Sequence, residues 1–193
     1  MNERGWTSNF NPFSLWAMSI ITGRGDSGET DLLFGKRIPK SSLRIECLGC
    51  VDELNAALGM ARAAGARDEW VQLIDRLQEK LIGLMGQLAT LPEDHERYQE
   101  KGFPMIGMAD VDWVVAEAHR YEAMGIRFTG WARPGAEGSQ ARASVDFARS
   151  VARRAERAVW RLHESGEPVA EPVRLFFNKV ADLLWILARV EAD

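Results

Sequence analysis

The segment EPVRLFFNKVADLLWILARVEAD, residues 171–193, decides the fold class of this chain. Pro172 lies near its first turn, where proline is tolerated because the first N–H groups of a helix have no intrahelical partner. The residues that follow are apolar on nearly every side of a helix, not on one stripe. A helix of that kind lies at the centre of a bundle or in a contact between subunits.

Four further segments repeat apolar residues at helical spacing. They cover residues 44–65, 68–90, about 109–124 and 139–163. After residue 40 no segment alternates apolar and polar residues as a half-exposed strand would. We therefore predict an all-α protein, most simply an up-and-down bundle of these five helices, built from residues 18–193 after an N-terminal tail of residues 1–17.

The chain of 193 residues has a net charge of −4, with 46% hydrophobic and 27% charged residues. These proportions are ordinary for a globular protein, and the acidic balance argues against a nucleic-acid partner, since nucleic-acid-binding domains are normally basic. The sequence contains no run of about 18 apolar residues, so it predicts no membrane span. The first 17 residues lack the basic start and apolar core of a signal peptide, so neither export nor membrane insertion is expected.

Two cysteines, Cys47 and Cys50, form a lone C-x-x-C motif. Without a second Cys or His pair nearby they make a poor zinc site. Their helical surroundings favour small buried residues, and a redox pair is the alternative. Free thiols are usual under reducing conditions, so we expect a cytoplasmic location.

A glycine-rich stretch, TGRGDSGETDLLFGKR at residues 22–37, precedes the predicted helices. Its first three glycines match the dinucleotide fingerprint, but that motif needs a strand before it and a helix directly after it. Gly35 and Pro39 would break such a helix, and no Gly-Lys-Ser/Thr follows for a P-loop, so both motifs are rejected. Two interpretations remain: a loop whose N–H groups and nearby cations bind an anion, or an ordered turn with solvated charges.

An arginine stripe runs along the segment 139–163, with Arg149, Arg153, Arg157 and Arg161 at four-residue steps on one helix face. Arg153 and Arg157 stand among small apolar residues, so we expect them to have an anionic partner, because an unpaired buried charge is costly. Asp52 is a candidate partner, and Asn178 and Asp182 are polar positions in the apolar last helix. Each could be a solvated or satisfied polar group; together they favour a polyphosphate held against the bundle.

These motifs together resemble the ATP:cob(I)alamin adenosyltransferases of the propanediol-utilisation type. The loop aligns without gaps with that family's Thr-Lys-Thr-Gly-Asp-x-Gly-x-Thr pattern through Thr22, Gly25, Asp26, Gly28 and Thr30. GKRIPK and RIECLGCVDELNAALG then follow in the family's order. FARSVARRAERAV is close to its most characteristic motif, and FFNKVADLLWILAR is similar to its Asn-Arg-Leu-Ser-Asp-Leu-Leu-Phe helix. The resemblance spans residues 20–190 and is weakest over about 92–130.

The resemblance implies that the five helices form a ferritin-like bundle and that the chain assembles as a homotrimer with ATP bound between subunits. The reaction would move the 5'-deoxyadenosyl group of ATP to the cobalt(I) of a corrinoid, giving adenosylcobalamin and tripolyphosphate, with Mg²⁺ on the phosphates. Asp52, Arg153 and Arg157 would be catalytic, with Asp52 and Arg153 pairing across the interface. The ATP-binding positions carried over are Thr22, Gly23, Arg24, Gly25, Asp26, Gly28, Thr30, Lys40, Arg153, Arg154, Glu156, Arg157 and Asn178. No residue is carried over as a metal ligand.

Further partners implied are a reductase that converts cob(II)alamin to cob(I)alamin and an acceptor enzyme that uses adenosylcobalamin. The sequence departs from the family at Gly23 and Arg24, which replace a basic residue and a threonine, and at Asp31, which adds negative charge near the expected phosphates. WARPGA at 131–136 replaces Phe-x-Leu-Pro-Gly-Gly near the corrin, where Trp131 could keep the lower axial ligand off cobalt. Two hypotheses stay open: a working adenosyltransferase, or a non-catalytic trimer that binds ATP or a corrinoid as a sensor or carrier.

Overall fold

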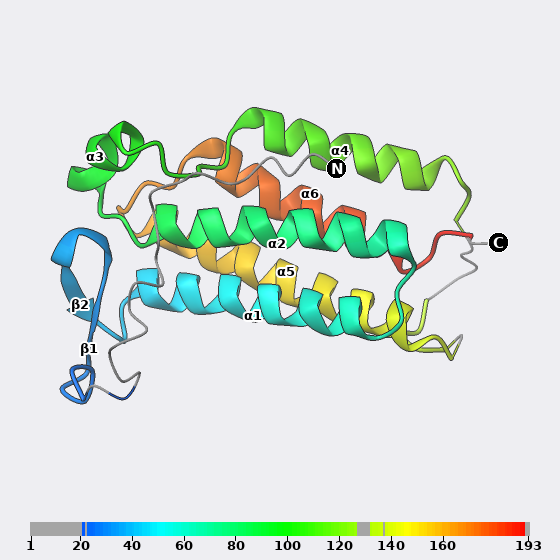
Figure 1. Cartoon of the computed structure of the whole chain (residues 1–193), viewed down its shortest axis with the longest axis horizontal. Helices are drawn as coiled ribbons and strands as arrows, with labels where there is room; N and C mark the ends of the chain where they lie inside the picture. Colours follow the sequence, from blue (N-terminus) through cyan, green and yellow to red (C-terminus); the bar gives the residue numbers. More distant parts are fainter. Residues whose placement is uncertain (1–20, 22, 127–131, 137, 192–193) are drawn as a thin grey trace, which may run out of the picture.

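The computed structural model describes residues 21, 23–126, 132–136 and 138–191. Within these residues, five long helices and one short helix follow a two-stranded hairpin (Figure 1). The helices are α1 (Leu43–Ala63), α2 (Asp68–Leu88), α3 (His95–Glu100), α4 (Met108–Glu122), α5 (Gln140–Glu164) and α6 (Glu171–Leu187). The long helices match the five predicted segments to within about two residues at each end, except that α6 ends earlier, at Leu187. The all-α bundle is thereby confirmed.

Two small elements were not predicted from the sequence pattern. One is the hairpin of β1 (Glu29–Asp31) and β2 (Arg37–Pro39), joined by the 3-10 turn η1 (Leu33–Gly35). The other is α3 with the preceding 3-10 turn η2 (Pro92–Asp94). Both are too short for a hydrophobic period to be read. The hairpin does confirm that no helix opens directly from the glycine-rich stretch.

Local signals place the helix starts. The Ser42 hydroxyl accepts a hydrogen bond from the Ile45 N–H at 3.4 Å and caps α1. Ser139 caps α5 in the same way, accepting from the Arg142 N–H at 3.3 Å. Pro172 lies in the first turn of α6, as expected. These residues satisfy or remove N–H groups that a helix start leaves without partners.

The long helices form a ring in the order α2, α1, α5, α6, α4 (Figure 1). Backbone packing joins α2 to α1, α1 to α5, α5 to α6 and α6 to α4. Side chains close the ring between α4 and α2: Lys80 Nζ lies 2.7 Å from an Asp110 carboxylate oxygen. The guanidinium of Arg76 also lies 4.0 Å from the centre of the Trp113 ring, a cation–π contact.

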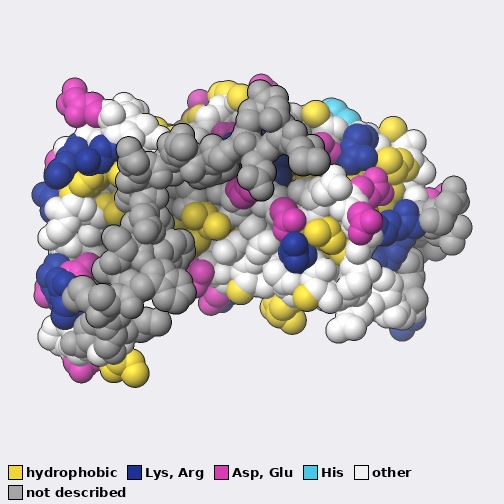
Figure 2. Space-filling model, viewed as in Figure 1, with side chains coloured by type: hydrophobic (Ala, Val, Ile, Leu, Met, Phe, Trp, Pro, Cys, Tyr) yellow, Lys and Arg dark blue, Asp and Glu magenta, His cyan; other side chains and the backbone are white. Residues whose placement is uncertain are grey.

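The bundle has two distinct ends (Figure 1). The hairpin end carries the hairpin, the last turn of α2 and the α5–α6 connection. The C-terminal end carries the α1–α2 connection and residues 188–191. On the face shown in Figure 2, Lys and Arg side chains lie beside Asp and Glu side chains at the hairpin end. None of the described helices is both long enough and apolar enough to span a membrane.

The apolar surround of α6 is explained within one chain. Phe176, Phe177, Leu183, Leu184 and Leu187 are fully buried, because α6 packs against α4 on one side and α5 on another. Burial within the bundle is therefore observed for this helix, and its contribution to a contact between subunits stays a prediction. Each such side chain contributes about 1.5–3 kcal/mol by leaving water, so α6 anchors the core.

Both cysteines are buried free thiols on α1, as predicted. Burial raises the pKa of the Cys47 thiol to about 12. A thiol in that state is a poor nucleophile and a poor metal ligand, since both roles need the thiolate. The interpretation as small core residues therefore fits the structure.

Candidate functional site

The glycine loop, residues 23–28, consists of two successive tight turns. The Asp26 N–H donates to the Gly23 carbonyl at 3.1 Å, and the Gly28 N–H donates to the Gly25 carbonyl at 3.2 Å. Gly23 and Gly28 have φ values of 69° and 86°, in the left-handed region that favours glycine. The predicted site residue Thr22 lies outside the described residues.

Lys40 lies against this loop. Its N–H donates to the Gly28 carbonyl at 2.8 Å, and a Cβ added at Gly25 would lie only 2.8 Å from Lys40 Nζ. Gly25 therefore leaves the space that the ammonium group occupies. No described carboxylate lies within ion-pairing distance of Lys40. A cation held beside the loop without a counter-ion among the described residues favours the anion-binding interpretation of the loop over a plain turn.

Charged side chains of the hairpin pair with one another beside the loop. An Asp31 carboxylate oxygen lies 3.2 Å from Arg24 Nη2 and 2.9 Å from Arg37 Nη1. Arg37 also lies 3.4 Å from a Glu29 carboxylate oxygen and donates to the Arg24 carbonyl at 3.0 Å. The negative charge that Asp31 adds is thus compensated by two arginines. Thr30 is half-buried opposite Ile38 in the hairpin.

The outward face of α5 carries Arg153, Arg154 and Arg157, all of them exposed. The expectation that Arg153 and Arg157 are packed between small apolar residues was wrong. Ala152 and Ala155 point inward, and a rotation of about 100° per residue turns the adjacent arginines outward. Arg157 has no ion-pair partner among the described residues, while Arg154 pairs with Glu53 of α1.

Glu156 joins two of the predicted site residues. Its carboxylate lies 2.8 Å from Arg153 Nη1 on the same helix and accepts a hydrogen bond from Asn178 Nδ2 on α6 at 3.1 Å. The Glu156 side chain is 13% exposed, whereas that of Arg153 is 48% exposed. The carboxylate is therefore fixed between two helices and pairs with the guanidinium of an arginine that is half exposed.

Asp52 is exposed on α1, and no described basic side chain lies within ion-pairing distance of it. Its neighbour Glu53 reaches Arg154, so the two helices bring this acidic position alongside the α5 arginines. Within the described chain, neither a hydrogen bond nor an ion pair joins the glycine loop to those arginines. The pairing of Asp52 with Arg153 across subunits stays a prediction.

Trp131, which the resemblance placed near the corrin, lies outside the described residues. Of the rest of its motif, Ala132 is half-buried and Arg133 is exposed. The Ala136 N–H donates to the Arg133 carbonyl at 3.2 Å, which closes a turn. The preceding chain is fixed at the C-terminal end by a backbone bridge between Ile126 and Val190.

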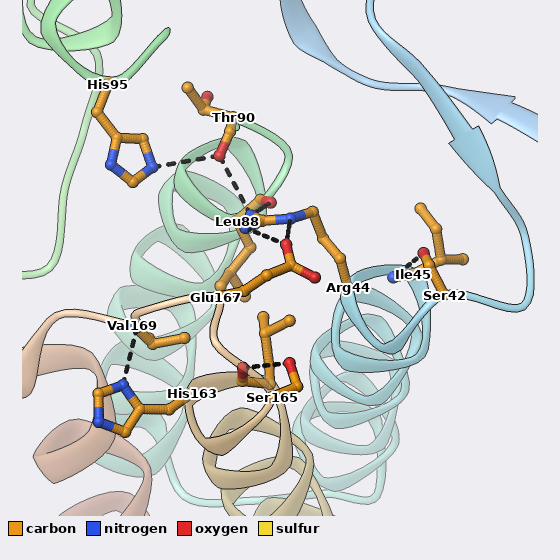
Figure 3. A network of polar contacts seen from close by, with 11 residues as sticks. Ser42, Arg44, Ile45, Leu88, Thr90, His95, His163, Ser165, Glu167 and Val169 are labelled. Atoms are coloured by element: carbon orange, nitrogen blue, oxygen red, sulfur yellow. Dashed lines mark hydrogen bonds and ion pairs between the residues drawn. The ribbon is translucent and has the colours of Figure 1, made fainter. Parts of the chain in front are cut away.

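Metal-binding side chains do not cluster in the described part of the chain: no group of three or more His, Cys, Asp or Glu residues is placed to hold an ion there. A buried arginine that was not among the predicted site residues lies at the hairpin end instead. Arg44 contacts Leu88, Thr90 and Glu167 (Figure 3). It continues the apolar stripe of α1 backward from Cys47 by three residues, and this register could have revealed its burial.

A family model described as cobalamin adenosyltransferase matches residues 20–191. A cobalamin adenosyltransferase from Cupriavidus metallidurans is 37% identical over 172 residues, covering 89% of this chain and 86% of the relative. The corrinoid adenosyltransferase PduO of Salmonella typhimurium is 32% identical over 177 residues. That match covers 90% of this chain and 50% of the relative, so this chain spans about half of the relative's length.

Solved structures give the same result. A variant PduO-type ATP:corrinoid adenosyltransferase from Lactobacillus reuteri, complexed with cobalamin and ATP, is similar with a TM-score of 0.76 and 26% identity. The match covers 89% of this chain and 92% of that one. A second variant from the same organism, complexed with ATP, is similar with a TM-score of 0.74, 25% identity and coverages of 88% and 92%.

Proposed function

The chain belongs to the cobalamin adenosyltransferase family, and from that premise we propose that it transfers the 5'-deoxyadenosyl group of ATP to the cobalt(I) of a corrinoid. The products are adenosylcobalamin and tripolyphosphate. The relative complexed with cobalamin and ATP supports this pair of substrates. One observation carries the proposal: the Lys40 ammonium group lies against the glycine loop without a described counter-ion, so a cation is available there to bind a polyphosphate.

We assign ATP binding to the glycine loop with Lys40 and to the outward face of α5 with Asn178. The proposed residues are Thr22, Gly23, Arg24, Gly25, Asp26, Gly28, Thr30, Lys40, Arg153, Arg154, Glu156, Arg157 and Asn178. The fixed position of Glu156 supports this assignment, because it orients Arg153 without neutralising the whole arginine face. Arg157, which has no ion pair within the described chain, supplies a charge available to phosphate.

The proposed reaction is a displacement at the 5'-carbon of ATP. An electron pair of cobalt(I) forms the cobalt–carbon bond, and the bond from that carbon to the phosphate oxygen breaks, so tripolyphosphate leaves with the electrons. Cobalt(I) is itself a strong nucleophile, and the protein contributes binding, orientation and charge. Lys40, Arg153 and Arg157 would stabilise the leaving group. Holding the reacting atoms in line is worth up to about 7–11 kcal/mol.

We propose that Mg²⁺ arrives with ATP, held mainly by the phosphates. The described residues fit that arrangement, because their carboxylates form no three-ligand cluster and Asp31 and Glu29 are already paired with arginines. Mg²⁺ commonly binds through substrate phosphates with one or two carboxylates. When bound, it would neutralise part of the polyphosphate charge, while Lys40 and the arginines act on the rest.

We further propose a homotrimer with the ATP site between subunits and Asp52 of one subunit paired with Arg153 of the next. The exposure of both side chains and the lack of a described partner for Asp52 support this arrangement, since Arg153 can accept a second carboxylate beside Glu156 across an interface. A cytoplasmic location, a reductase that supplies cobalt(I) and an acceptor enzyme for adenosylcobalamin complete the proposal. The free thiols of Cys47 and Cys50 are compatible with such reducing surroundings.

The test is a spectral assay of the purified protein with ATP, Mg²⁺ and chemically reduced cob(I)alamin, following formation of adenosylcobalamin. We expect turnover by the wild type and its loss in Arg153→Ala and Asp52→Ala. Sedimentation of the same variants separates loss of assembly from loss of chemistry. Turnover that persists in both variants would contradict the assigned site.

Absence of turnover in a wild type that still binds ATP would favour the non-catalytic sensor or carrier. The substitutions in the WARPGA segment, including Trp131 and Arg133, motivate that alternative. Spectra of bound cob(II)alamin would then decide whether the corrinoid binds with its lower ligand detached, the state expected of an enzyme that needs reduction to cobalt(I).

A further inference from the structure

We propose that Arg44 is a positioning residue for the glycine loop: together with Glu167 it fixes the hairpin end on which the loop stands, and thereby sets the affinity for ATP. This inference rests on the proposed function, because it assumes that the loop binds the phosphates of ATP. Arg44 does not belong to the loop or to the α5 face. It acts through the chain segments that it joins.

The Arg44 side chain connects three segments. It is 3% exposed, and its Nη1 donates to the carbonyls of Leu88 at 2.7 Å and Thr90 at 3.2 Å (Figure 3). Its Nε and Nη2 both lie 2.8 Å from a carboxylate oxygen of Glu167. One planar guanidinium therefore holds together the first turn of α1, the end of α2 and the α5–α6 connection, a task that suits its fixed fork of donors.

The end of α2 is also where the hairpin docks. The last carbonyls of a helix lack intrahelical partners and attract donors and cations. Leu88 and Thr90 accept from Arg44, and the Ala89 carbonyl between them accepts from the Leu33 N–H of η1 at 3.0 Å. Three consecutive carbonyls thus hold Arg44 and the hairpin in alternation. A shift at Arg44 moves the same turn that seats the hairpin.

The path from Arg44 to the loop is short. Three residues separate Arg44 from Lys40, and one of them, Ser42, caps α1. Lys40 holds the Gly28 carbonyl at 2.8 Å and lies against Gly25. The position of Lys40 relative to the turn N–H groups therefore depends on how firmly the first turn of α1 is held.

The C-terminal end offers a matched control. There Arg189 Nη2 lies 3.0 Å from a carboxylate oxygen of Asp146, and the two side chains are 9% and 3% exposed. This pair also joins a buried arginine to a carboxylate, although Asp146 is more buried than Glu167, which is 39% exposed, and it lies at the opposite end of the bundle from the glycine loop. Weakening this ion pair should lower the stability of the fold without changing the affinity for ATP.

The experiment compares the wild type, Arg44→Lys, Glu167→Gln and Arg189→Lys in the full chain. Calorimetric titration with Mg·ATP, KM for ATP, KM for cob(I)alamin, kcat and the thermal unfolding midpoint are measured for each. Lysine keeps the charge but cannot reach two carbonyls and a carboxylate together. We expect Arg44→Lys to weaken ATP binding by about fivefold or more, with kcat at saturating ATP and KM for cob(I)alamin changed less than about twofold.

Glu167→Gln should weaken ATP binding in the same direction and by less, since its amide oxygen can still accept from Arg44. If Arg44→Lys does not fold, the ATP affinity of Glu167→Gln tests the inference in its place. Wild-type ATP affinity in these two variants would overturn the inference, and so would an equal loss in Arg189→Lys at a matched fall in unfolding midpoint. If titration of the wild type alone shows no ATP binding, the proposed function itself is overturned, and no variant is needed to see this.

Discussion

Helices α1 and α5 pack against each other, and their inward and outward faces differ in chemistry. Leu54 of α1 and Ala155 of α5 are fully buried. Asp52 and Arg157, each two residues away from one of them, are exposed and have no ion-pair partner in the described part of the chain. Neighbouring positions on one helix therefore differ in function: the inward residues determine the fold, and the outward residues carry the proposed chemistry. Stability and activity should respond to different substitutions.

Among substitutions that test this difference between the faces, Arg157→Ala should have the largest effect, a loss of activity with little change in stability. Removing an outward cation that we propose to bind the leaving group is expected to lower kcat/KM for ATP by about a hundredfold or more. The free energy of unfolding should change by no more than about 0.5 kcal/mol, because the residue is exposed. Steady-state kinetics and denaturant unfolding check the two halves of this prediction.

Arg161→Ala is the control for Arg157→Ala, because Arg161 is exposed one turn further along α5 and is not assigned to the site. Its activity should stay near that of the wild type. An equal loss in both variants would mean that overall positive charge, and not the position of Arg157, matters.

Ala155→Leu tests the inward face. A larger side chain in the α1–α5 contact is expected to cost about 1–3 kcal/mol of stability, since the site is fully buried. This cost corresponds to about 2–4 °C of unfolding midpoint per kcal/mol. Activity per folded molecule should persist. Ser150→Leu, on the exposed face of the same helix, is the size-matched control and should leave the midpoint nearly unchanged.

Cys47 gives the inward face a pH dependence. Its folded pKa is raised to about 12 from an ordinary value of 9.0, chiefly by burial. Unfolding releases a thiol that ionises more readily, so its contribution is fully present below pH 9 and is lost as the pH rises toward 12. The stability difference between wild type and Cys47→Ala should fall by up to about 1.4 kcal/mol per pH unit in that window. Urea unfolding of both proteins from pH 8 to 10.5 measures this difference. If their free energies of unfolding change in parallel with pH, the prediction is wrong.

Asp31→Asn should have the smallest effect. Asp31 forms ion pairs with Arg24 of the glycine loop and Arg37 of the hairpin. Arg157 on α5, by contrast, has no ion pair in the described chain. Releasing Arg24 and Arg37 is expected to tighten ATP binding by about twofold to threefold, since exposed ion pairs are worth at most about 1 kcal/mol. Calorimetric titration measures the change, with Glu29→Gln as the control that loosens Arg37 alone. Weaker ATP binding in Asp31→Asn would show that the carboxylate supports the loop.

The long helices could be predicted from sequence because their apolar residues repeat over many turns. The series Cys47, Val51, Leu54 and Leu58 falls on one face and is buried throughout. The hairpin and α3 could not be predicted, since three to six residues contain no readable period and long-range contacts decide their conformation. Leu33, for example, bonds to Ala89, far away in the chain.

The candidate site was predictable in its residue types but not in its geometry. The clustering of Arg153, Glu156 and Asn178 is observed, yet the arginines are exposed where burial was expected. Sequence neighbours alone do not reveal the rotation that separates Ala152 from Arg153 on a helix, unless the phase of the core stripe is followed residue by residue. The burial of Arg44 could have been predicted from its phase in the core stripe, but its partners Leu88, Thr90 and Glu167 could not, because they are distant in the chain.

The docking of the hairpin on α2 also has a consequence for local unfolding. The hairpin has two three-residue strands, and its bonds to the bundle come from residues distant in the chain, such as Leu33 with Ala89 and Lys36 with Glu93 at 3.2 Å. Segments held by few contacts open with much less free energy than the core. We therefore expect amide hydrogens of the glycine loop and the hairpin to exchange well before those of α1 and α6, and nucleotide to slow that exchange. The segment that we propose to bind ATP is thus expected to become fully ordered only when the nucleotide is bound.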